Sequence, residues 1–275
     1  IEYAMNAAKN GAYDFLEKPF NSDRLLFLVE KALQERDLKI KLMDSSNEWL
    51  KSNQIIGKSS KIKNIKNICL KVSKSNSRIL ITGPSGSGKE TCARFIHSVS
   101  NRMNHPFVVA ACASLSNQMV DQLLFGFNDN KNNKDTISLF EQANNGTIYF
   151  NEICDLPVET QAKLINVIQD QSFYKYGSNK KIKIDIRVIA GTTHDPNEAV
   201  KNGILREDLY YRLSVVPIVI PSLNSRIEDI NILINSFMEV ASKLFNKNKL
   251  IFSNETYILL QNFNWKGNVR QLKNL

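Results

Sequence analysis

The chain has 275 residues, of which 43% are hydrophobic and 23% charged, a composition typical of a soluble globular protein with one large or two modest domains. No apolar run approaches the roughly 20 residues that cross a bilayer, so the sequence predicts no membrane-spanning segment. The formal net charge of +9 allows a nucleic-acid partner, but the dispersed lysines between Lys58 and Lys74 carry no aromatic or helix-turn-helix pattern, which favours a solvated face. Four cysteines lack metal-binding spacing, which favours reduced thiols in a cytoplasmic protein.

Residues 1–36 predict a helix, a short strand and a second helix. Gly11 interrupts the first helix, and residues 13–16 form a short apolar strand. The apolar residues of the second helix continue in a rough heptad to Met43, so a coiled dimer helix and a plain packed helix both stay open. Polar residues then mark a linker, which we place at 37–53. Because the chain begins without a signal-like segment, we expect it to be a piece of a longer chain.

A glycine-rich turn follows the apolar run at 79–81 and precedes a predicted helix. This arrangement predicts a phosphate-binding loop, because the glycines let backbone N–H groups surround the phosphates while a lysine and the helix dipole add positive charge. An ordinary tight turn is the alternative, but the spacing, the lysine and the flanking strand rarely coincide by chance. Glu90 departs from the general pattern, since Ser or Thr at this position usually ligates Mg²⁺, and Thr91 comes one residue late. The predicted nucleotide-binding residues of this segment are Gly83, Pro84, Ser85, Gly86, Ser87, Gly88, Lys89, Glu90 and Thr91.

From Gln54 onward strands and helices alternate, which predicts an α/β domain with a parallel sheet. A helix is predicted over 158–170, where apolar residues recur at helical spacing. After Pro221 the pattern becomes entirely helical, which predicts a lid that is still running at Leu275. The predicted strands are 78–82, 107–111, 147–150, 182–190 and 215–220.

Five segments together resemble, in order and spacing, the AAA+ domain of the NtrC family of bacterial enhancer-binding proteins, the sigma-54-dependent activators. The resemblance covers about residues 54–275, and its Arg-Glu-Asp-Leu and Gly-Asn-Val-Arg segments are highly specific. It implies a P-loop AAA+ parallel sheet over 54–222, followed by a truncated helical lid over 223–275. The five segments are 83–90, 124–126, 146–153, 205–213 and 265–272.

Residues 1–36 resemble the C-terminal third of a response-regulator receiver domain, which has a flavodoxin-like fold. Lys18 matches the phosphate-contacting lysine of that domain, and Phe15 matches its switch aromatic residue. The phosphorylated Asp is then expected upstream of this chain and a Fis-type DNA-binding domain downstream. The resemblance therefore implies a sensor histidine kinase and DNA as partners. It also implies further copies of the chain, as a dimer and as an ATP-dependent higher oligomer.

The family resemblance implies roles for individual side chains. Glu152 matches the residue that orients the attacking water, and Arg206 and Arg212, six apart on a helix, match arginine fingers that reach the neighbouring subunit's site. Arg270 matches the sensor II arginine, which contacts phosphate when the lid closes. From the residues alone, a solubilising carboxylate, surface ion pairs on a helix and a surface lid charge stay open for these positions.

Three positions of the hydrolysis machinery depart from the family's pattern. Asn151 replaces the Asp that helps to hold Mg²⁺, which weakens the metal site. Ala111 replaces the switch Asn on the preceding strand and cannot hydrogen-bond Glu152. Sensor I, usually Ala-Thr-Asn, reads Gly-Thr-Thr at 191–193, so only the hydroxyl of Thr193 remains there.

The loop with the sequence GAFTGA, which contacts sigma-54 in the family, is missing. Residues 127–138 are short, polar and without the Phe-Thr pair, which predicts a disordered surface loop. NtrX-like members of the family depart at this loop, so the resemblance is closest to the NtrX-like branch.

These observations lead to one preferred function and two alternatives. The preferred function is a cytoplasmic two-component response regulator of transcription whose AAA+ module binds ATP and Mg²⁺ and oligomerises, with slow or absent hydrolysis. The first alternative is an active ATPase that remodels sigma-54 RNA polymerase at promoters, which Asn151, Ala111 and the missing loop disfavour. The second alternative is a decaying gene product in which nucleotide binding persists but control is lost.

Overall fold

The computed structural model describes residues 54–111, 117–129, 134–245 and 252–275. The described residues all belong to one compact unit, which spans residues 53–275. The receiver fragment, the linker and the heptad helix that the sequence predicts before residue 54 lie outside the described residues, and they stay predictions.

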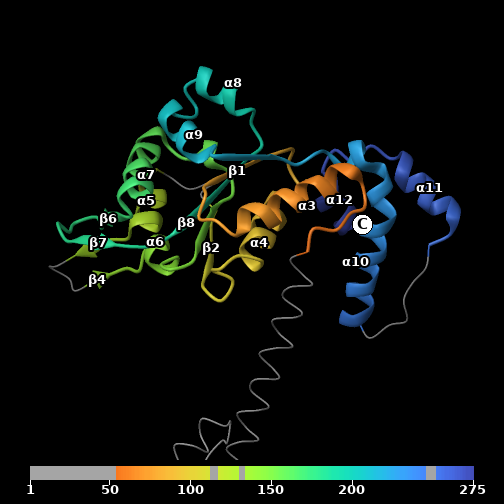
Figure 1. Cartoon of the computed structure of the whole chain (residues 1–275), viewed down its shortest axis with the longest axis horizontal. Coiled ribbons are helices and arrows are strands. Elements are labelled where there is room, and N and C mark those ends of the chain that lie inside the picture. Colours follow the sequence, from red (N-terminus) through yellow and green to blue (C-terminus); the bar gives the residue numbers. More distant parts are fainter. Residues whose placement is uncertain (1–53, 112–116, 130–133, 246–251) are drawn as a thin grey trace, which may run out of the picture. The chain divides into compact units, whose positions relative to one another are not determined.

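A five-stranded parallel sheet forms the centre of the described unit (Figure 1). Across the sheet its strands are β2 (Phe107–Ala110), β5 (Thr147–Phe150), β8 (Arg187–Thr192), β1 (Ile79–Thr82) and β9 (Val216–Val219). Each neighbouring pair runs parallel; for example, Ile79 pairs with Ile189 on one side and Val216 on the other. β1, β5 and β8 are buried along nearly their whole length, which explains why much of their sequence is a continuous apolar run.

Helices cover both faces of this sheet, and each face has its own apolar core (Figure 1). One face carries α3 (Ser60–Ser73) and α4 (Lys89–Ser98), and the other carries α5 (Asn117–Phe125), α6 (Leu139–Gln142), α7 (Val158–Asp170), α8 (Pro196–Lys201) and α9 (Glu207–Leu213). Because side chains alternate along a strand, Ile79 and Ile81 join the first core and Leu80 joins the second. The α/β fold and the helix over 158–170 are therefore confirmed.

The strand predicted over 182–190 is wrong as a single element. The structure instead has a short β7 (Lys181–Lys183), antiparallel to β6 (Ser172–Tyr174), and only then β8. Gln171 shapes the interval between them: its backbone O accepts from Ile184 N at 2.9 Å, and its Oε1 accepts from Ile186 N at 2.8 Å. These bonds replace a continuous ladder, and the alternating pattern of the sequence contains no signal of them.

The polar segment at 127–138, for which we expected disorder, is ordered at both ends. β3 (Asn128–Asp129) and β4 (Lys134–Asp135) form a two-residue antiparallel ladder. Asn128 N donates to Tyr176 O at 2.8 Å, which ties the ladder to the chain that follows β6. The expectation of disorder is therefore wrong for the two ends of the segment.

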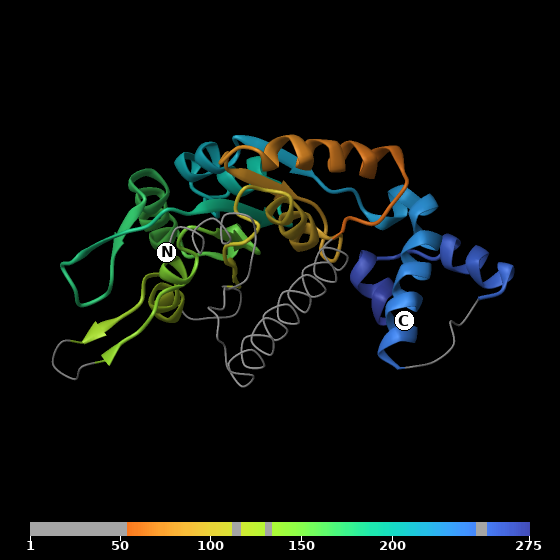
Figure 2. The ribbon, with the colours of Figure 1, turned by 60° about the horizontal axis from the view of Figure 1, so that its bottom comes forward.

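After the sheet the chain is helical, as predicted. The lid consists of η2 (Leu223–Asp229), α10 (Ile230–Leu244), α11 (Asn254–Asn262) and α12 (Asn268–Asn274), and Figure 2 shows the three α-helices beside one another. The lid has its own apolar core around Trp265, whose ring centroid lies 4.8 Å from that of Phe263 and whose indole N–H donates to Leu260 O at 2.8 Å. Within the described ranges, no helix is both long and apolar enough to cross a membrane.

Candidate nucleotide-binding site

The phosphate loop (residues 83–90) lies between the carboxyl end of β1 and α4, as a phosphate-binding loop requires. Gly83 N donates to Thr192 O, at the end of the neighbouring strand β8, at 3.3 Å. Gly86 and Gly88 have positive φ angles of 72° and 110°, which side chains other than glycine rarely adopt. The loop therefore lies at the edge of the sheet where open α/β folds bind their ligands.

Every carbonyl group of the loop from Gly83 to Gly88 has a hydrogen-bond donor. Three of the donors come from the loop and α4, and three come from the lid: the side chains of Asn268 and Arg226 and the backbone N–H of Arg270. In chain order the donors are Lys89 Nζ (3.0 Å), Ser87 N (3.1 Å), Asn268 Nδ2 (2.8 Å), Arg270 N (3.2 Å), Arg226 Nη2 (2.8 Å) and Cys92 N (2.9 Å).

Several donors of the same loop are unused. The backbone N–H groups of Gly86, Gly88 and Lys89 donate to no group in the part of the chain that the structure describes. Ser87 Oγ is buried and also lacks a hydrogen-bond partner among the described residues. Unused backbone N–H groups in a glycine-rich turn form a nest for anions, and a phosphate group would satisfy them. The residues present therefore fit a phosphate-bearing ligand.

Lys89 and Glu152 form an ion pair at this loop. Lys89 is only 6% exposed, and its Nζ lies 3.2 Å from Oε1 of Glu152, the second residue after β5. The other carboxylate oxygen, Oε2, accepts from Thr193 N at 2.7 Å and from Thr193 Oγ1 at 3.3 Å. The ends of β1, β5 and β8 thus bring the predicted lysine, glutamate and sensor I threonine together. Thr193 holds Glu152, although Ala111 offers no amide.

The side chains predicted to lie near a metal ion do not converge on a common point. Glu90 pairs with Arg94, whose Nε and Nη2 both lie 2.8 Å from Glu90 Oε1, and Thr91 is exposed. The side chain of Asn151 has no hydrogen-bond partner among the described residues. In the same ranges, no group of three or more His, Cys, Asp and Glu residues has the arrangement that holds a metal ion. The described side chains therefore do not form a metal site by themselves.

Arg206 and Arg212 lie at the two ends of α9. The expectation that both lie on the helix is wrong for Arg206, which precedes α9 as its N-cap with an extended backbone. The Arg206 guanidinium contacts both carboxylate oxygens of Asp208, at 3.1 and 2.8 Å, and this pairing raises the pKa of Arg206. Buried Gln161 on α7 accepts from Arg206 N at 2.9 Å and so fixes the turn before α9. Within the described chain, neither arginine bonds to the phosphate loop.

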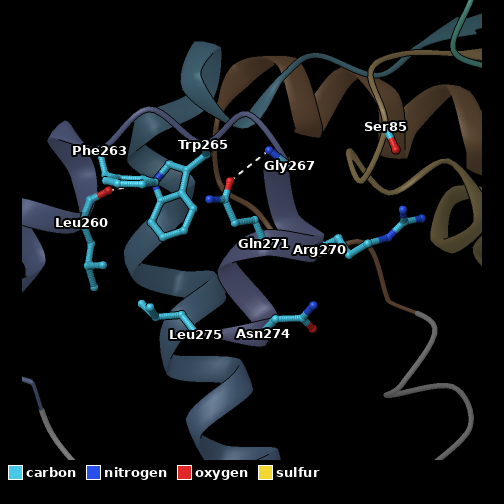
Figure 3. Close-up of a pocket in the computed structure, with 9 residues that line it drawn as sticks. All are labelled: Ser85, Leu260, Phe263, Trp265, Gly267, Arg270, Gln271, Asn274 and Leu275. Carbon is cyan, nitrogen blue, oxygen red and sulfur yellow. Dashed lines mark hydrogen bonds between the residues drawn. The ribbon is translucent and has the colours of Figure 1, made fainter.

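A cavity of about 540 Å³ lies between the phosphate loop and the lid (Figure 3). Leu260, Phe263 and Trp265 give it an apolar wall, and Arg270 extends from α12 toward Ser85. In the ranges that the structure describes, the Arg270 guanidinium has no hydrogen-bond or ion-pair partner. The lid thus places an unpaired positive charge near the loop.

Sequence reasoning missed the residues that support the site. Asn268 and Arg226 bind two carbonyl groups of the loop, and Gln161 positions Arg206. Asn268 could have been predicted, because it belongs to the same Gly-Asn-Val-Arg segment as Arg270. The other two stand among polar residues in the sequence, and nothing there signals that they are buried.

Tyr149 on β5 explains the glycine at position 191, one part of the departure at sensor I. Its side chain is fully buried, its hydroxyl lacks a partner among the described residues, and burial raises the pKa of Tyr149 well above its ordinary value. A Cβ atom built on Gly191 would lie 2.5 Å from the Tyr149 hydroxyl oxygen and 2.8 Å from Asn151 O, both too close for a stable contact. Glycine at this sensor I position therefore makes room for the tyrosine.

The sheet, the phosphate loop and the lid define a P-loop fold of the AAA+ type. The sigma-54 interaction domain family matches residues 55–219, and the AAA+ ATPase lid domain family matches residues 224–275. The nitrogen assimilation regulatory protein NtrX of Azorhizobium caulinodans is 40% identical over 274 residues, which cover 100% of this chain and 60% of that protein. A putative NtrX-like response regulator of Rickettsia conorii is 39% identical and is covered over 58% of its length, again with 100% of this chain.

Solved structures give the same result. The crystal structures of Brucella abortus NtrX in complex with ADP and with ATP match with a TM-score of 0.83 and 37% identity, over 99% and 100% of this chain and 59% of each solved chain. The chain belongs to the sigma-54 interaction domain family, and it is similar over its whole length to response regulators of the NtrX and NtrC type. It spans about 60% of the length of the relatives that it matches.

We predict that Gly191→Ala destabilises the protein by roughly 1–3 kcal/mol, because the added methyl group overpacks the site against the Tyr149 hydroxyl. In a Tyr149→Phe background the same substitution should cost clearly less. Urea unfolding of the wild type, both single variants and the double variant measures the coupling free energy. Equal costs of Gly191→Ala in both backgrounds would show that the hydroxyl does not require the glycine.

Proposed function

We propose that this chain is the ATP-binding AAA+ module of a cytoplasmic two-component transcription regulator, which oligomerises and hydrolyses ATP slowly or not at all. The observation that carries the proposal is the phosphate loop: its carbonyl groups have donors, the backbone N–H groups of Gly86, Gly88 and Lys89 are unused, and the Lys89 side chain adds positive charge. Brucella NtrX, which shares the fold, has been crystallised with ADP and with ATP, and this supports a nucleotide as the ligand.

Binding in this scheme exchanges the partner of Lys89. Its ammonium group lies 3.2 Å from the Glu152 carboxylate. When a phosphate takes the place of Glu152, the buried Lys89 ammonium keeps an anionic partner. Glu152 then remains held by Thr193, in a position from which it orients the attacking water. Arg270 is the lid residue that we assign to the phosphates, because its guanidinium has no partner among the described residues.

Arg206 and Arg212 are assigned to the site of a neighbouring copy. Neither contacts the phosphate loop of its own chain within the described residues, so a contribution to phosphoryl transfer requires an oligomer. Asp208 holds the Arg206 guanidinium on both of its carboxylate oxygens, and docking of a second copy would have to exchange this partner for phosphate. We therefore propose that the chain forms a dimer and, with ATP, a higher oligomer.

Weak hydrolysis follows from two substitutions at the strand ends. Mg²⁺ would be held by the nucleotide's phosphates and by the neutral amide oxygen of Asn151, where a carboxylate would bind more strongly. When bound, the cation neutralises charge that develops on the phosphates. Ala111 supplies no switch side chain, so Lys89 and Thr193 are the partners of the Glu152 carboxylate in the described part of the chain.

An active ATPase that remodels sigma-54 RNA polymerase is the second candidate, favoured by the family match over 55–219. We place it second because the segment 127–138 contains no GAFTGA sequence, and residues 128–129 and 134–135 within it pair in a two-residue ladder. Since the chain spans about 60% of its relatives' length, we propose that the rest of the protein supplies a receiver domain phosphorylated by a sensor kinase and a DNA-binding domain. In this proposal the protein acts as a DNA-bound oligomer.

Lys89→Ala should weaken ATP binding by about tenfold or more, equivalent to ~1.4 kcal/mol, because phosphates in a nest of amides still need a countercharge. Titration with a fluorescent ATP analogue measures the affinity, and Lys201→Ala, which changes an exposed lysine, is the matched control. Equal affinity of wild type and Lys89→Ala would remove the nucleotide-site assignment.

Hydrolysis should be partly repairable. Combining Asn151→Asp with Ala111→Asn restores a carboxylate for the metal and an amide for Glu152, so phosphate release should rise several-fold above the wild type. Coupled-enzyme measurement of phosphate release compares the wild type, the double variant and Glu152→Gln. A wild-type rate that equals the double variant's, and is far above that of Glu152→Gln, would contradict the proposal of impaired hydrolysis.

A further inference from the structure

We propose that Asn268 and Arg226 of the lid are positioning residues, which hold the phosphate loop in its anion-binding shape before a nucleotide arrives. The inference rests on the proposed ATP-binding function and assigns to it two side chains that do not contact the nucleotide themselves. It also makes the lid part of the binding site when the site is empty, and not only when the lid closes on a ligand.

Asn268 joins two distant pieces of backbone through one side chain. It is 2% exposed and has a left-handed φ of 52°, a conformation in which asparagine is more common than most residues. Its Oδ1 accepts from Leu223 N at 2.8 Å, where the lid begins, and its Nδ2 donates to Ser85 O at 2.8 Å. Only a planar amide has an acceptor and a donor placed for both contacts, since a carboxylate has no N–H to give.

Arg226 supplies the second contact, although the burial of its charge is unfavourable. It is 4% exposed, it interrupts η2 with non-helical φ and ψ angles, and burial lowers the pKa of Arg226. Its Nη2 donates to Ser87 O at 2.8 Å, whereas its Nε has no partner among the described residues. A buried cation with an unpaired N–H is destabilising by itself, and the contact with the loop compensates for this together with the negative charge of buried Asp229.

The backbones of loop and lid also touch directly between these two contacts. Arg270 N donates to Gly86 O at 3.2 Å, and a Cβ atom on Gly86 would lie 2.3 Å from Gly267 O. The carbonyl groups of three successive loop residues, Ser85 to Ser87, are therefore all bound by the lid. In a trans peptide unit the C=O and the N–H point in opposite directions. When the lid binds the carbonyl oxygen, the N–H of that unit therefore points away from the lid contact, which is the orientation that a phosphate needs. Without these donors, the peptide units would be free to turn oxygen atoms toward the phosphates.

The decisive variant is Asn268→Asp, which keeps the acceptor for Leu223 N and replaces the donor to Ser85 O with an oxygen. Asn262→Asp, an exposed change at the end of α11, adds the same charge to the lid and is the matched control. ATP affinity is measured with a fluorescent analogue, and the emission of Trp265, in a Trp49→Phe background, reports whether the lid core stays intact. We expect Asn268→Asp to bind ATP about tenfold or more weakly, with unchanged emission, and Asn262→Asp to stay within about twofold of the wild type.

Equal affinities of Asn268→Asp and Asn262→Asp would overturn the inference. If the emission of Asn268→Asp shows that its lid core has opened, Arg226→Met decides, because it removes the Ser87 contact while filling the same buried space. Its ATP affinity should fall at both low and high salt, and an unchanged affinity, or a loss that disappears at high salt, would overturn the inference. Wild-type protein that binds no ATP would instead refute the proposed function, so the two failures are distinguishable.

Discussion

The nucleotide site depends on the hydrogen bonding of six consecutive carbonyl groups, from Gly83 to Gly88. The loop and α4 supply part of this requirement, through Lys89 Nζ and the backbone N–H groups of Ser87 and Cys92, and the lid supplies the rest. Sheet and lid have separate apolar cores, yet polar contacts join them at the loop. Because every carbonyl group has a donor, the unused N–H groups of Gly86, Gly88 and Lys89 remain for an anion. The binding site is thus a product of both parts, which short-range sequence patterns do not reveal.

The same region links binding to hydrolysis through one charge pair. Lys89 and Glu152 neutralise each other while no anion is present. Thr193, which follows the neighbouring strand β8, also hydrogen-bonds the Glu152 carboxylate. The binding parts, the loop and the lysine, are therefore complete. The parts that act on the metal and on the orientation of Glu152 are reduced, since Asn151 is neutral and Ala111 has no polar side chain. A module that holds ATP and turns it over slowly is the consequence that we draw.

Much of the fold could be predicted from the sequence, because buried parallel strands and a glycine-rich loop have strong local signatures. What could not be predicted depends on contacts that form only in the folded chain. The strand over 182–190 was divided by contacts with Gln171, and these arise only once the chain has folded. Nothing in the sequence explains the glycine at position 191, and the structure supplies a reason by placing the Tyr149 hydroxyl beside it. Likewise, Asn268 gains its role from a loop more than 180 positions away in the chain, at Ser85. Pair contacts of this kind leave no pattern in a single sequence.

The central claim is that the chain uses ATP to bind and assemble and not to drive sigma-54 promoter opening. The most direct test measures open-complex formation in vitro at a sigma-54 promoter, with sigma-54 RNA polymerase and the intact protein that contains this chain. The account predicts no more open complex with ATP than without it, because residues 127–138 offer no GAFTGA sequence for the contact. ATP-dependent open complexes that disappear with Arg206→Ala would contradict the account and establish the protein as an ATP-driven activator.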